Sequence, residues 1–149
     1  MSVGEYCNRE VVIVSTNESV REAVNLMRHH HVGSVVVVDG KGDAVKPKGI
    51  LTDRDVVVEL LAEDVDLTAV NVGDVMSADL VTVDETVPLL DALELMKKGG
   101  VRRAPIVNAK GYLIGVLAVD DILELLAEQL NSIVSLIALE QRREKGARE

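Results

Sequence analysis

The sequence predicts an α/β (α+β) fold made of two similar units, because one pattern of strands and helices occurs twice. Three segments recur in the same order, the first without a gap: Val12–Met27 as Val81–Met96, Val32–Asp39 as Val101–Asn108, and Gly49–Asp55 as Gly115–Asp121. A duplication of this size indicates two half-domains that pack against each other. We therefore expect functional sites in related pairs.

Each copy is predicted to run strand, helix, strand, strand, helix. In the first copy, the β-branched residues from Val12 favour a short strand. Ser19 suits a helix N-cap, and apolar residues follow it at helical spacing through Met27. Val35–Val38 is apolar on both faces, which predicts a strand that is covered on both sides. The segment Asp39–Lys48 is expected to form a turn and a loose hairpin tip before the returning strand.

The second copy restates these elements. Leu89–Met96 carries the helical stripe, and Gly99–Gly100 ends that helix. Pro105–Val107 is predicted as a strand and Asn108–Gly111 as a tighter hairpin. The stretch Ala62–Met76 between the copies has no Pro/Gly-rich linker, so we expect a packed bridge within one domain.

The chain is divided on this basis into five parts: an N-terminal segment (1–11), the first repeat (12–62), a connecting segment (63–79), the second repeat (80–130), and a C-terminal helix with a charged tail (131–149). The apolar residues of the last helix lie close to a heptad spacing: Ile122, Leu126, Leu130, Ile133 and Ile137. Two interpretations stay open, a helix that covers the core of its own domain and a helix that forms a dimer. The tail from Gln141 is expected to fray.

The amino-acid composition disfavours some classes of function. Of 149 residues, 48% are hydrophobic, which is typical of a well-packed α/β protein. Phe and Trp are absent and only two Tyr occur, which disfavours a stacking surface for single-stranded nucleic acid. A formal net charge of -9 also opposes general binding to a phosphate backbone. Any bound anion must therefore be held by a local basic cluster.

The predicted location is the cytoplasm. The single cysteine, Cys7, cannot form an internal disulfide, which favours a reducing compartment. The N-terminal residues lack the basic and apolar regions of a signal peptide. No apolar stretch is expected to reach the roughly 18 residues of a spanning helix, so no membrane association is predicted.

The sequence predicts no catalysis, no cofactor and no metal site. It contains no Gly-x-Ser-x-Gly elbow, no Walker loop and no Gly-x-Gly-x-x-Gly motif. Nothing places a base beside Cys7, so it is a poor candidate nucleophile. The run His29–His31 is not expected to bind a metal, because adjacent residues of a helix point about 100° apart. It fits better as the polar C-terminus of a helix.

The cluster Gly49–Asp55 combines a strand with the start of a helix. The N-terminus of a helix carries backbone N–H groups that attract phosphate, and the Thr52 hydroxyl and the Arg54 guanidinium could add donors. Asp55 is placed to accept a pair of hydrogen bonds, as an acidic residue does from ribose in other nucleotide folds. On spacing alone, an ordinary N-cap with a solvated charge pair is the favoured explanation of the cluster.

The equivalent positions of the second copy differ. Ala118 replaces Thr52, Asp120 replaces Arg54, and Asp121 keeps the place of Asp55. Basic groups occur instead at Arg102–Arg103, before the buried strand. Two adjacent arginines in so acidic a chain would be a natural anchor for an anion, although they could also be ordinary surface charge.

Together these residues resemble a pair of cystathionine-β-synthase (CBS) domains, also called a Bateman module. The resemblance covers about Val12 to Leu126 and rests on four motifs present in order: V-x-V at Val12 and Val81, a helix ending in Leu-Met at Met27 and Met96, V-x-x-x-P-I-V at Val101–Val107, and G-h-h-T-x-x-D at Gly49–Asp55. It implies a stand-alone protein of two β-α-β-β-α units whose sheets pack about a pseudo-twofold axis.

The resemblance further implies two crevices, each shared between the repeats, that bind adenosine compounds such as AMP, ADP, ATP, S-adenosylmethionine or sometimes NADH. In the first crevice, Asp55 would bind ribose, Thr52 and Arg54 would bind phosphate, and the base would lie near Val81 and Val101. The full set that the resemblance assigns to this crevice is Ile50, Thr52, Arg54, Asp55, Val81, Val101, Arg102 and Arg103.

For the second crevice the resemblance assigns Cys7, Val12, Val32, Gly33, Val116, Ala118, Asp120 and Asp121, with Asp121 on ribose. Ala118 removes a phosphate-facing hydroxyl, and Asp120 adds a carboxylate near the expected anion. The two crevices should therefore be unequal, with the Thr52/Asp55 crevice the better nucleotide site. Arg102 and Arg103 could reach phosphate in either.

The function implied by the resemblance is regulatory: the protein would bind an adenine nucleotide and signal occupancy to an unidentified partner protein. A homodimer, in which two pairs associate face to face as a flat disc, is expected. The alternative from another class is an interaction or dimerisation module with vestigial crevices, which acts through its long terminal helix. Nucleic-acid binding is disfavoured by the charge and by the scarcity of aromatic residues.

Overall fold

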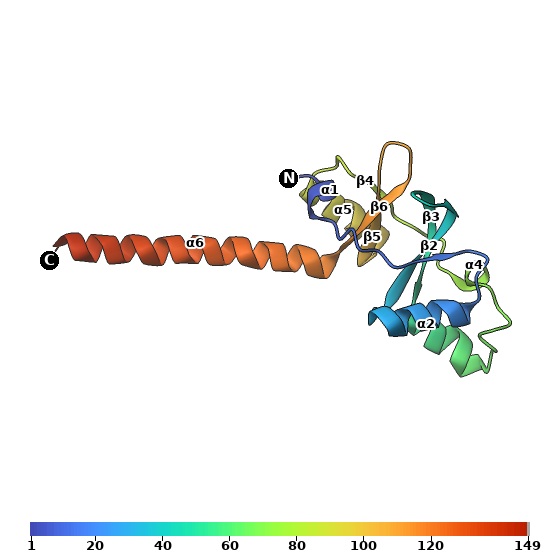
Figure 1. Cartoon of the computed structure of the whole chain (residues 1–149). Helices are drawn as coiled ribbons and strands as arrows, with labels where there is room; N and C mark the ends of the chain where they lie inside the picture. Colours follow the sequence, from blue (N-terminus) through green and yellow to red (C-terminus); the bar gives the residue numbers. More distant parts are fainter. Residues whose placement is uncertain (149) are drawn as a thin grey trace. The chain divides into compact units, whose positions relative to one another are not determined.

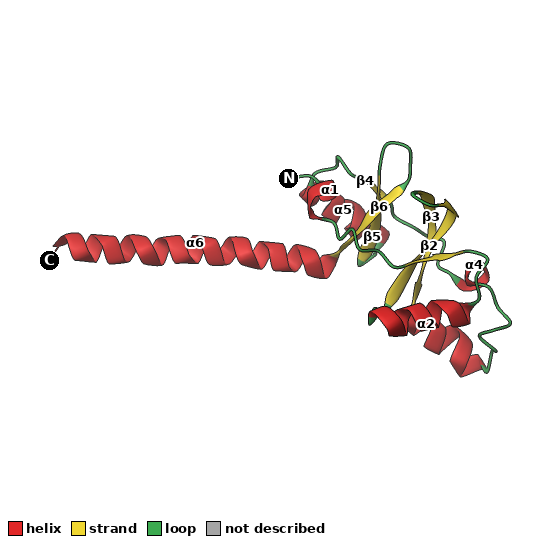
Figure 2. Ribbon diagram, in the orientation of Figure 1, coloured by secondary structure: helices red, strands yellow, loops and turns green. Residues whose placement is uncertain are grey.

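The computed structural model describes residues 1–148 and the side chains of residues 1–147. The chain divides into two compact units, the body Met1–Leu117 and the segment from Ala118 onwards, and each is described by itself. The predicted order of strand, helix, strand, strand, helix occurs twice, each time with a three-stranded sheet (Figure 1, Figure 2). The predicted α/β fold with two repeats is confirmed.

The first repeat forms a sheet in the order β1-β2-β3. β1 (Ile13–Ser15) lies parallel to β2 (Ser34–Lys41), and β2 lies antiparallel to β3 (Ala44–Thr52). A parallel pair needs a crossover, which α2 (Val20–His30) provides. The predicted N-cap is confirmed, because the Ser19 side chain accepts a hydrogen bond from a backbone N–H of the first turn of α2.

The hairpin between β2 and β3 is more regular than the sequence suggested. The segment Asp39–Lys48 was expected to be a loose tip, but the strands continue until Lys41 pairs with Ala44. The turn is confined to Gly42–Asp43, where Gly42 adopts a φ of +60°. Glycine reaches this left-handed conformation without strain, which allows the charged segment to remain paired.

The helical run after β3 changes type along its length. It begins with α3 (Asp53–Asp55), continues as the π-helical turn η1 (Val56–Leu60), and ends as the 3-10 turn η2 (Leu61–Glu63). A helix from Asp53 was predicted, and its position is confirmed. Its irregularity was not foreseen.

The strands of the second repeat form a sheet in the order β4-β5-β6. Its elements within the body are β4 (Val83–Asp84), α5 (Leu89–Gly99), β5 (Arg103–Val107) and β6 (Leu113–Ala118). The helix ends as predicted, with Gly100 as a left-handed C-cap at a φ of +64°.

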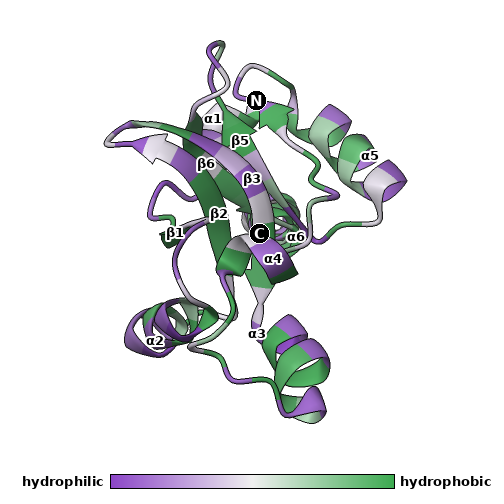
Figure 3. Ribbon diagram, turned by 90° about the vertical axis from the view of Figure 1, so that its right-hand side faces the viewer, coloured by the Kyte–Doolittle hydropathy of each residue, from purple (hydrophilic) through white to green (hydrophobic). Residues whose placement is uncertain are grey.

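The valine run of β2 is buried on both faces, as predicted. Val35 and Val37 belong to the core cluster that also includes residues of α2 and η1. Val36 and Val38 face the other way and pack with residues of the second sheet, including Leu113 and Val116 of β6. Figure 3 shows this strand as predominantly hydrophobic. β2 therefore packs against its own repeat on one face and against the second repeat on the other.

Two short helices, α1 (Val3–Tyr6) and α4 (Val72–Val75), begin with the same Val-Gly pair. Each is hydrogen-bonded to the opposite repeat. The Val3 N–H donates to the Val87 carbonyl at 2.9 Å, and the Val72 N–H donates to the Glu18 carbonyl at 2.8 Å. Val3 and Val72 are fully buried. The predicted packed bridge is confirmed for the second of these segments.

The residues after these helices complete the exchange between the repeats. Ser77 and Ile50 exchange two backbone hydrogen bonds of 3.0 and 3.2 Å, so the chain after α4 adds to the edge of β3. Asn8 and Val116 exchange two bonds of 2.9 Å at the edge of β6. Each repeat is thus completed by a segment that precedes the other repeat. We call the segment that contains α4 and Ser77, Asn71–Val81, the crossing segment.

The second unit contains α6 (Val119–Arg148), a helix of 30 residues. The charged residues from Gln141 belong to this helix through Arg148, which suits Glu, Lys and Arg as good helix formers and cations at a helix C-terminus. Glu149 lies outside the described residues. Contrary to expectation, an 18-residue window of α6 reaches a mean hydropathy of 1.6, so length and composition alone would permit a membrane span. A single helix of this kind is weak evidence for one.

Candidate functional site

A cavity of about 300 Å³ opens in the body beside the junction of β3 and α3. Three separate segments supply its lining: Ile50, Thr52 and Asp55 around this junction, Ser77, Asp79, Leu80 and Val81 from the crossing segment, and Val101, Arg102 and Arg103 at the start of β5. Both repeats therefore contribute to one cavity, because the crossing segment brings the second repeat against β3.

The structure gathers around this cavity all the residues assigned to the first crevice except Arg54, whose side chain is exposed. Sequence reasoning missed Ser77, Asp79 and Leu80. A signal for them was present, because the Val-Gly pair at Val3 recurs at Val72 with the same spacing as the repeated strands. Extending the repeat to these residues would have included the segments that cross between the copies.

Thr52 and Asp55 hold each other in place. The Thr52 side chain accepts a hydrogen bond from the Asp55 N–H at 3.1 Å, and Oδ2 of Asp55 accepts one from the Thr52 N–H at 3.1 Å. This reciprocal capping box fixes both side chains at the cavity wall. The Thr52 hydroxyl proton and Oδ1 of Asp55 take no part in it, so the pair retains one donor and one acceptor group for another molecule.

The backbone N–H groups at the start of α3 are not available in the way that the sequence suggested. The Asp53 N–H donates to the Gly33 carbonyl at 2.9 Å. The Arg54 N–H donates to Oδ1 of Asp53 at 2.8 Å, and the Asp55 N–H donates to Thr52. A phosphate at this position would have to displace one of these bonds. Positive side chains are therefore the more accessible source of anion recognition.

Charged groups line the cavity in equal numbers of each sign. Arg102 is exposed and Arg103 half-buried, at the entry to β5. Asp55 is half-buried within the capping box, and Asp79 is exposed on the crossing segment. Since the aspartates offset the arginines, a purely anionic ligand gains little here. A molecule with a hydroxyl-bearing part and an anionic part fits this distribution better.

The remaining cavity wall is apolar. Ile50, Leu80, Val81 and Val101 are all half-buried and line the same space. Branched aliphatic side chains can cover the faces of a flat ring without offering a competing hydrogen bond. The cavity thus combines an apolar slot, a carboxylate that is fixed in place and an arginine pair.

The residues assigned to the second crevice are divided between the two units. Cys7, Val12, Val32, Gly33 and Val116 lie in the body, whereas Ala118 ends β6 and Asp120 and Asp121 lie in the first turn of α6. The Asn8–Val116 pairing in the body repeats the Ser77–Ile50 pairing at the cavity. The second crevice itself stays a prediction.

Other reactive groups do not assemble into a site. Burial raises the pKa of the Cys7 thiol above its ordinary value, although the nearby Arg9 charge opposes this shift. His31 ends α2 as a left-handed C-cap with a φ of 53°. Over the part of the chain that the structure describes, no three His, Cys, Asp or Glu side chains are grouped so that they could hold a metal ion.

Sequence comparison defines the class of protein. The CBS domain family matches the chain over residues 3–62 and 72–128, and the chain therefore belongs to this family as a pair of CBS domains. Both matches begin at the Val-Gly pairs of α1 and α4, which agrees with the structural repeat.

Individual relatives support this assignment. The chain is 37% identical over 121 residues to the CBS domain-containing protein YhcV of Bacillus subtilis, which covers 81% of this chain and 82% of YhcV. It is 39% identical over 124 residues to an uncharacterised protein of Methanopyrus kandleri, covering 83% of this chain but only 62% of that relative. A CBS domain protein from Pyrobaculum aerophilum, solved in complex with AMP, superposes with a TM-score of 0.71 at 25% identity, covering 85% of this chain and 99% of that one.

Proposed function

We propose that this protein binds an adenine nucleotide, AMP, ADP or ATP, in the cavity between β3, the crossing segment and β5, and that occupancy regulates a partner protein. The observation that carries the proposal is the joint placement of Thr52, Asp55 and the Arg102–Arg103 pair around one cavity that both repeats line. The Pyrobaculum relative, whose structure contains AMP, supports the choice of ligand.

The ribose, phosphate and adenine of a nucleotide can each be matched with residues that line the cavity. Oδ1 of Asp55 can accept a hydrogen bond from a ribose hydroxyl without breaking the capping box, because only Oδ2 is used there. The Thr52 hydroxyl can donate to a phosphate oxygen, and Arg103 can add a charged donor. The adenine ring would lie against Val81 and Val101. Of the residues assigned to the first crevice, Arg54 alone does not line this cavity.

Regulation would follow because both repeats line the same cavity. A ligand that touches β3 and the crossing segment together contacts both repeats, so it favours one arrangement of these elements over others. Such a shift can reach a partner only if the ligand binds the two states with different affinity. No catalytic step is part of this proposal.

Isothermal titration with AMP, ATP and adenosine tests the proposal. The informative substitution is Asp55→Asn, because the amide oxygen can keep the bond from the Thr52 N–H while the charge and one acceptor are lost. We expect at least a tenfold weaker affinity for AMP and for adenosine, about 1.4 kcal/mol. Arg103→Met should weaken AMP binding by a similar factor and leave adenosine unchanged, because adenosine has no phosphate.

Asp43→Asn serves as a matched control, since this residue lies at the exposed hairpin tip and does not line this cavity. It should bind AMP like the unaltered protein. Absence of AMP, ADP and ATP binding at millimolar concentration would overturn the proposal. Binding that Asp55→Asn and Arg103→Met leave unchanged would place the nucleotide elsewhere and would overturn it equally.

A further inference from the structure

The second unit carries an unusually large apolar surface for a single helix. Five residues of α6 follow one another at alternating spacings of three and four: Leu123, Leu126, Leu130, Ile133 and Ile137. Their side chains are between 46% and 62% exposed. This is the spacing of the a and d positions of a coiled coil, and it continues through the middle of the helix. We call these five residues the seam.

The polar residues of α6 follow a different line. Glu124, Glu128, Asn131 and Ser135 recur at the same alternating spacing but are offset from the seam. Ser132, beside this line, turns its hydroxyl back to the Glu128 carbonyl at 3.0 Å. A helix with an apolar seam and a separate polar line is suited to packing against a partner in water.

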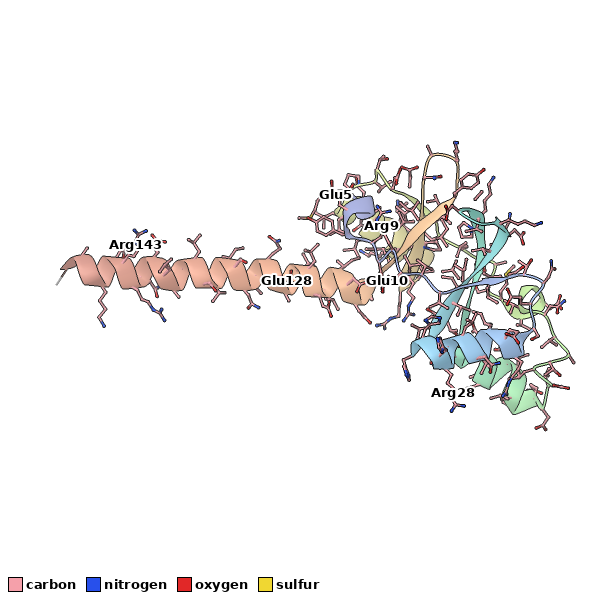
Figure 4. All side chains as sticks on the ribbon, in the orientation of Figure 1. Glu5, Arg9, Glu10, Arg28, Glu128 and Arg143 are labelled. Carbon is pink, nitrogen blue, oxygen red and sulfur yellow. The ribbon has the colours of Figure 1, made fainter. Side chains whose placement is uncertain are left out.

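Charge is distributed unevenly along α6. The first third contains Asp120, Asp121, Glu124 and Glu128 and no basic residue, whereas in the last turns Arg142, Arg143 and Lys145 outnumber Glu140 and Glu144. Figure 4 shows Glu128 in the first half of the helix and Arg143 close to its C-terminal end. Two parallel copies would place like charges side by side. Two antiparallel copies would place the acidic end of each beside the basic end of the other.

A membrane fits this helix less well than a second copy. Between Glu128 and Glu140 lie eleven uncharged residues, which span about 17 Å at 1.5 Å per residue, against about 30 Å for a hydrocarbon core. Gln129 and Asn131 lie within this short run. For a helix lying flat on the bilayer surface, the acidic polar line would be repelled by anionic lipids.

We propose that α6 pairs with α6 of a second copy of this chain as an antiparallel coiled coil. One register pairs four of the five seam residues with each other. In it, Leu130 packs against Ile133 of the second copy and Leu126 against Ile137 of the second copy. The two-fold axis of this register lies between Asn131 and Ser132.

Cysteine cross-linking of the full chain tests this register, because Leu123 lies opposite Glu140 of the second copy. Chains carrying Leu123→Cys and Glu140→Cys, each with Cys7→Ser and a different tag, are co-expressed and mildly oxidised. We expect cross-links between the two kinds of chain and few within one kind. Cross-links confined to chains of one kind would indicate a parallel pair and overturn the proposal, and so would the absence of any cross-link.

Two further variants of these cysteine-bearing chains test whether the seam causes the pairing. Leu130→Asp with Ile133→Asp places charge on the seam, and Asn131→Asp with Ser135→Asp places the same charge on the polar line. We expect at least a tenfold lower cross-link yield for the first pair and no change for the second. Equal yields in both would overturn the proposal. So would co-flotation of the unaltered protein with vesicles of phosphatidylcholine and phosphatidylglycerol when no cross-link forms.

Discussion

Thr52 and Asp55 hydrogen-bond each other twice, at 3.1 Å in each direction, across the start of the helical run that follows β3. The carboxylate therefore has one structural role and one proposed role in this protein. Oδ2 stabilises the fold by capping, whereas Oδ1 takes no part in the capping box and is the proposed ligand group. A substitution that removes the whole carboxylate would disturb both roles together.

The first prediction isolates the capping role by comparing the free energies of unfolding of two Asp55 variants. Asp55→Ala removes the acceptor of the Thr52 N–H and should lower the free energy of unfolding by about 1 kcal/mol, a value usual for a lost helix cap. Asp55→Asn should lower it by less than half as much, because the amide oxygen can accept the same bond. Urea denaturation of the ligand-free protein measures both values. Equal losses for Ala and Asn would show that the capping bond contributes little.

The second prediction concerns the glycines that begin the two returning motifs, Gly49 and Gly115. A Cβ on Gly49 would lie 2.6 Å from the Ser77 carbonyl oxygen and 2.7 Å from the Met76 sulfur. A Cβ on Gly115 would lie 2.6 Å from the Cys7 sulfur. Gly49→Ala and Gly115→Ala should each lower the free energy of unfolding by about 1 to 3 kcal/mol, because a well-packed interior must shift to accept a methyl group.

Gly146→Ala is the matched control for this pair, since nothing lies within 4 Å of a Cβ built there. Within a helix, alanine is favoured over glycine by about 0.8 to 1 kcal/mol, so this variant should be neutral or slightly stabilised. Thermal or urea unfolding of the three variants gives the comparison. If Gly49→Ala and Gly146→Ala behaved alike, the close approach of the crossing segment to β3 would not be required for stability.

Much of the body could be predicted from the sequence because its signals are local. The valine run Val35–Val38 indicated a strand buried on both faces, Ser19 indicated a helix start, and Gly100 indicated a helix end. Each depends on side-chain chemistry within a few residues, and each is confirmed. The duplication then extended these local predictions to the second repeat.

Features that depend on distant contacts were harder to predict. Whether Asp39–Lys48 was loop or strand depended on pairing across the whole hairpin, and the tight turn at Gly42 decided it. The crossing segment contributes to the cavity only because Ser77 pairs with Ile50, which no local pattern reveals. The occupied N–H groups of α3 depend partly on the Gly33 carbonyl from another strand end.

The third prediction concerns two similar turns, in which the pKa of an aspartate is lowered for different reasons. Asp84 has a lowered pKa chiefly because the Thr86 hydroxyl donates to it, at 2.7 Å. Asp66 has a lowered pKa chiefly because the Thr68 backbone N–H donates to it, at 3.0 Å. Replacing the hydroxyl in each turn, by Thr86→Val and Thr68→Val, should therefore raise the pKa of Asp84 more than that of Asp66.

The carboxyl chemical shifts of Asp84 and Asp66, followed by NMR between pH 2 and pH 6 in each variant, measure this difference. The sign for stability follows from the direction. A carboxyl whose folded pKa is below its ordinary value of 3.8 stabilises the fold above that pH, and this contribution is lost as the pH falls through the lower folded value. A larger shift at Asp66 than at Asp84 would reverse the assigned causes.

The fourth prediction concerns the only cysteine in the chain. Burial raises the pKa of the Cys7 thiol above its ordinary value, so the thiolate that reacts with iodoacetamide is scarce at neutral pH. Alkylation of the folded protein should be slower than that of the urea-unfolded chain, and its rate should reach half its maximum at a higher pH than the rate of the unfolded chain does. Because the folded state favours the protonated thiol, this group contributes stability below its unfolded pKa and loses it as the pH rises through the folded one.

Arg9 supplies the control for this assignment. Its guanidinium, which donates to the Gly4 carbonyl at 2.8 Å, places a positive charge that partly lowers the pKa of Cys7. Arg9→Gln removes this charge, so the pKa should rise further and alkylation of the folded protein should slow again. A faster reaction in Arg9→Gln would mean that the arginine restricts access of the reagent more than it stabilises the thiolate. The ratio of the rates at pH 7 and pH 10 distinguishes these causes, because access affects both rates equally and charge mainly affects the lower one.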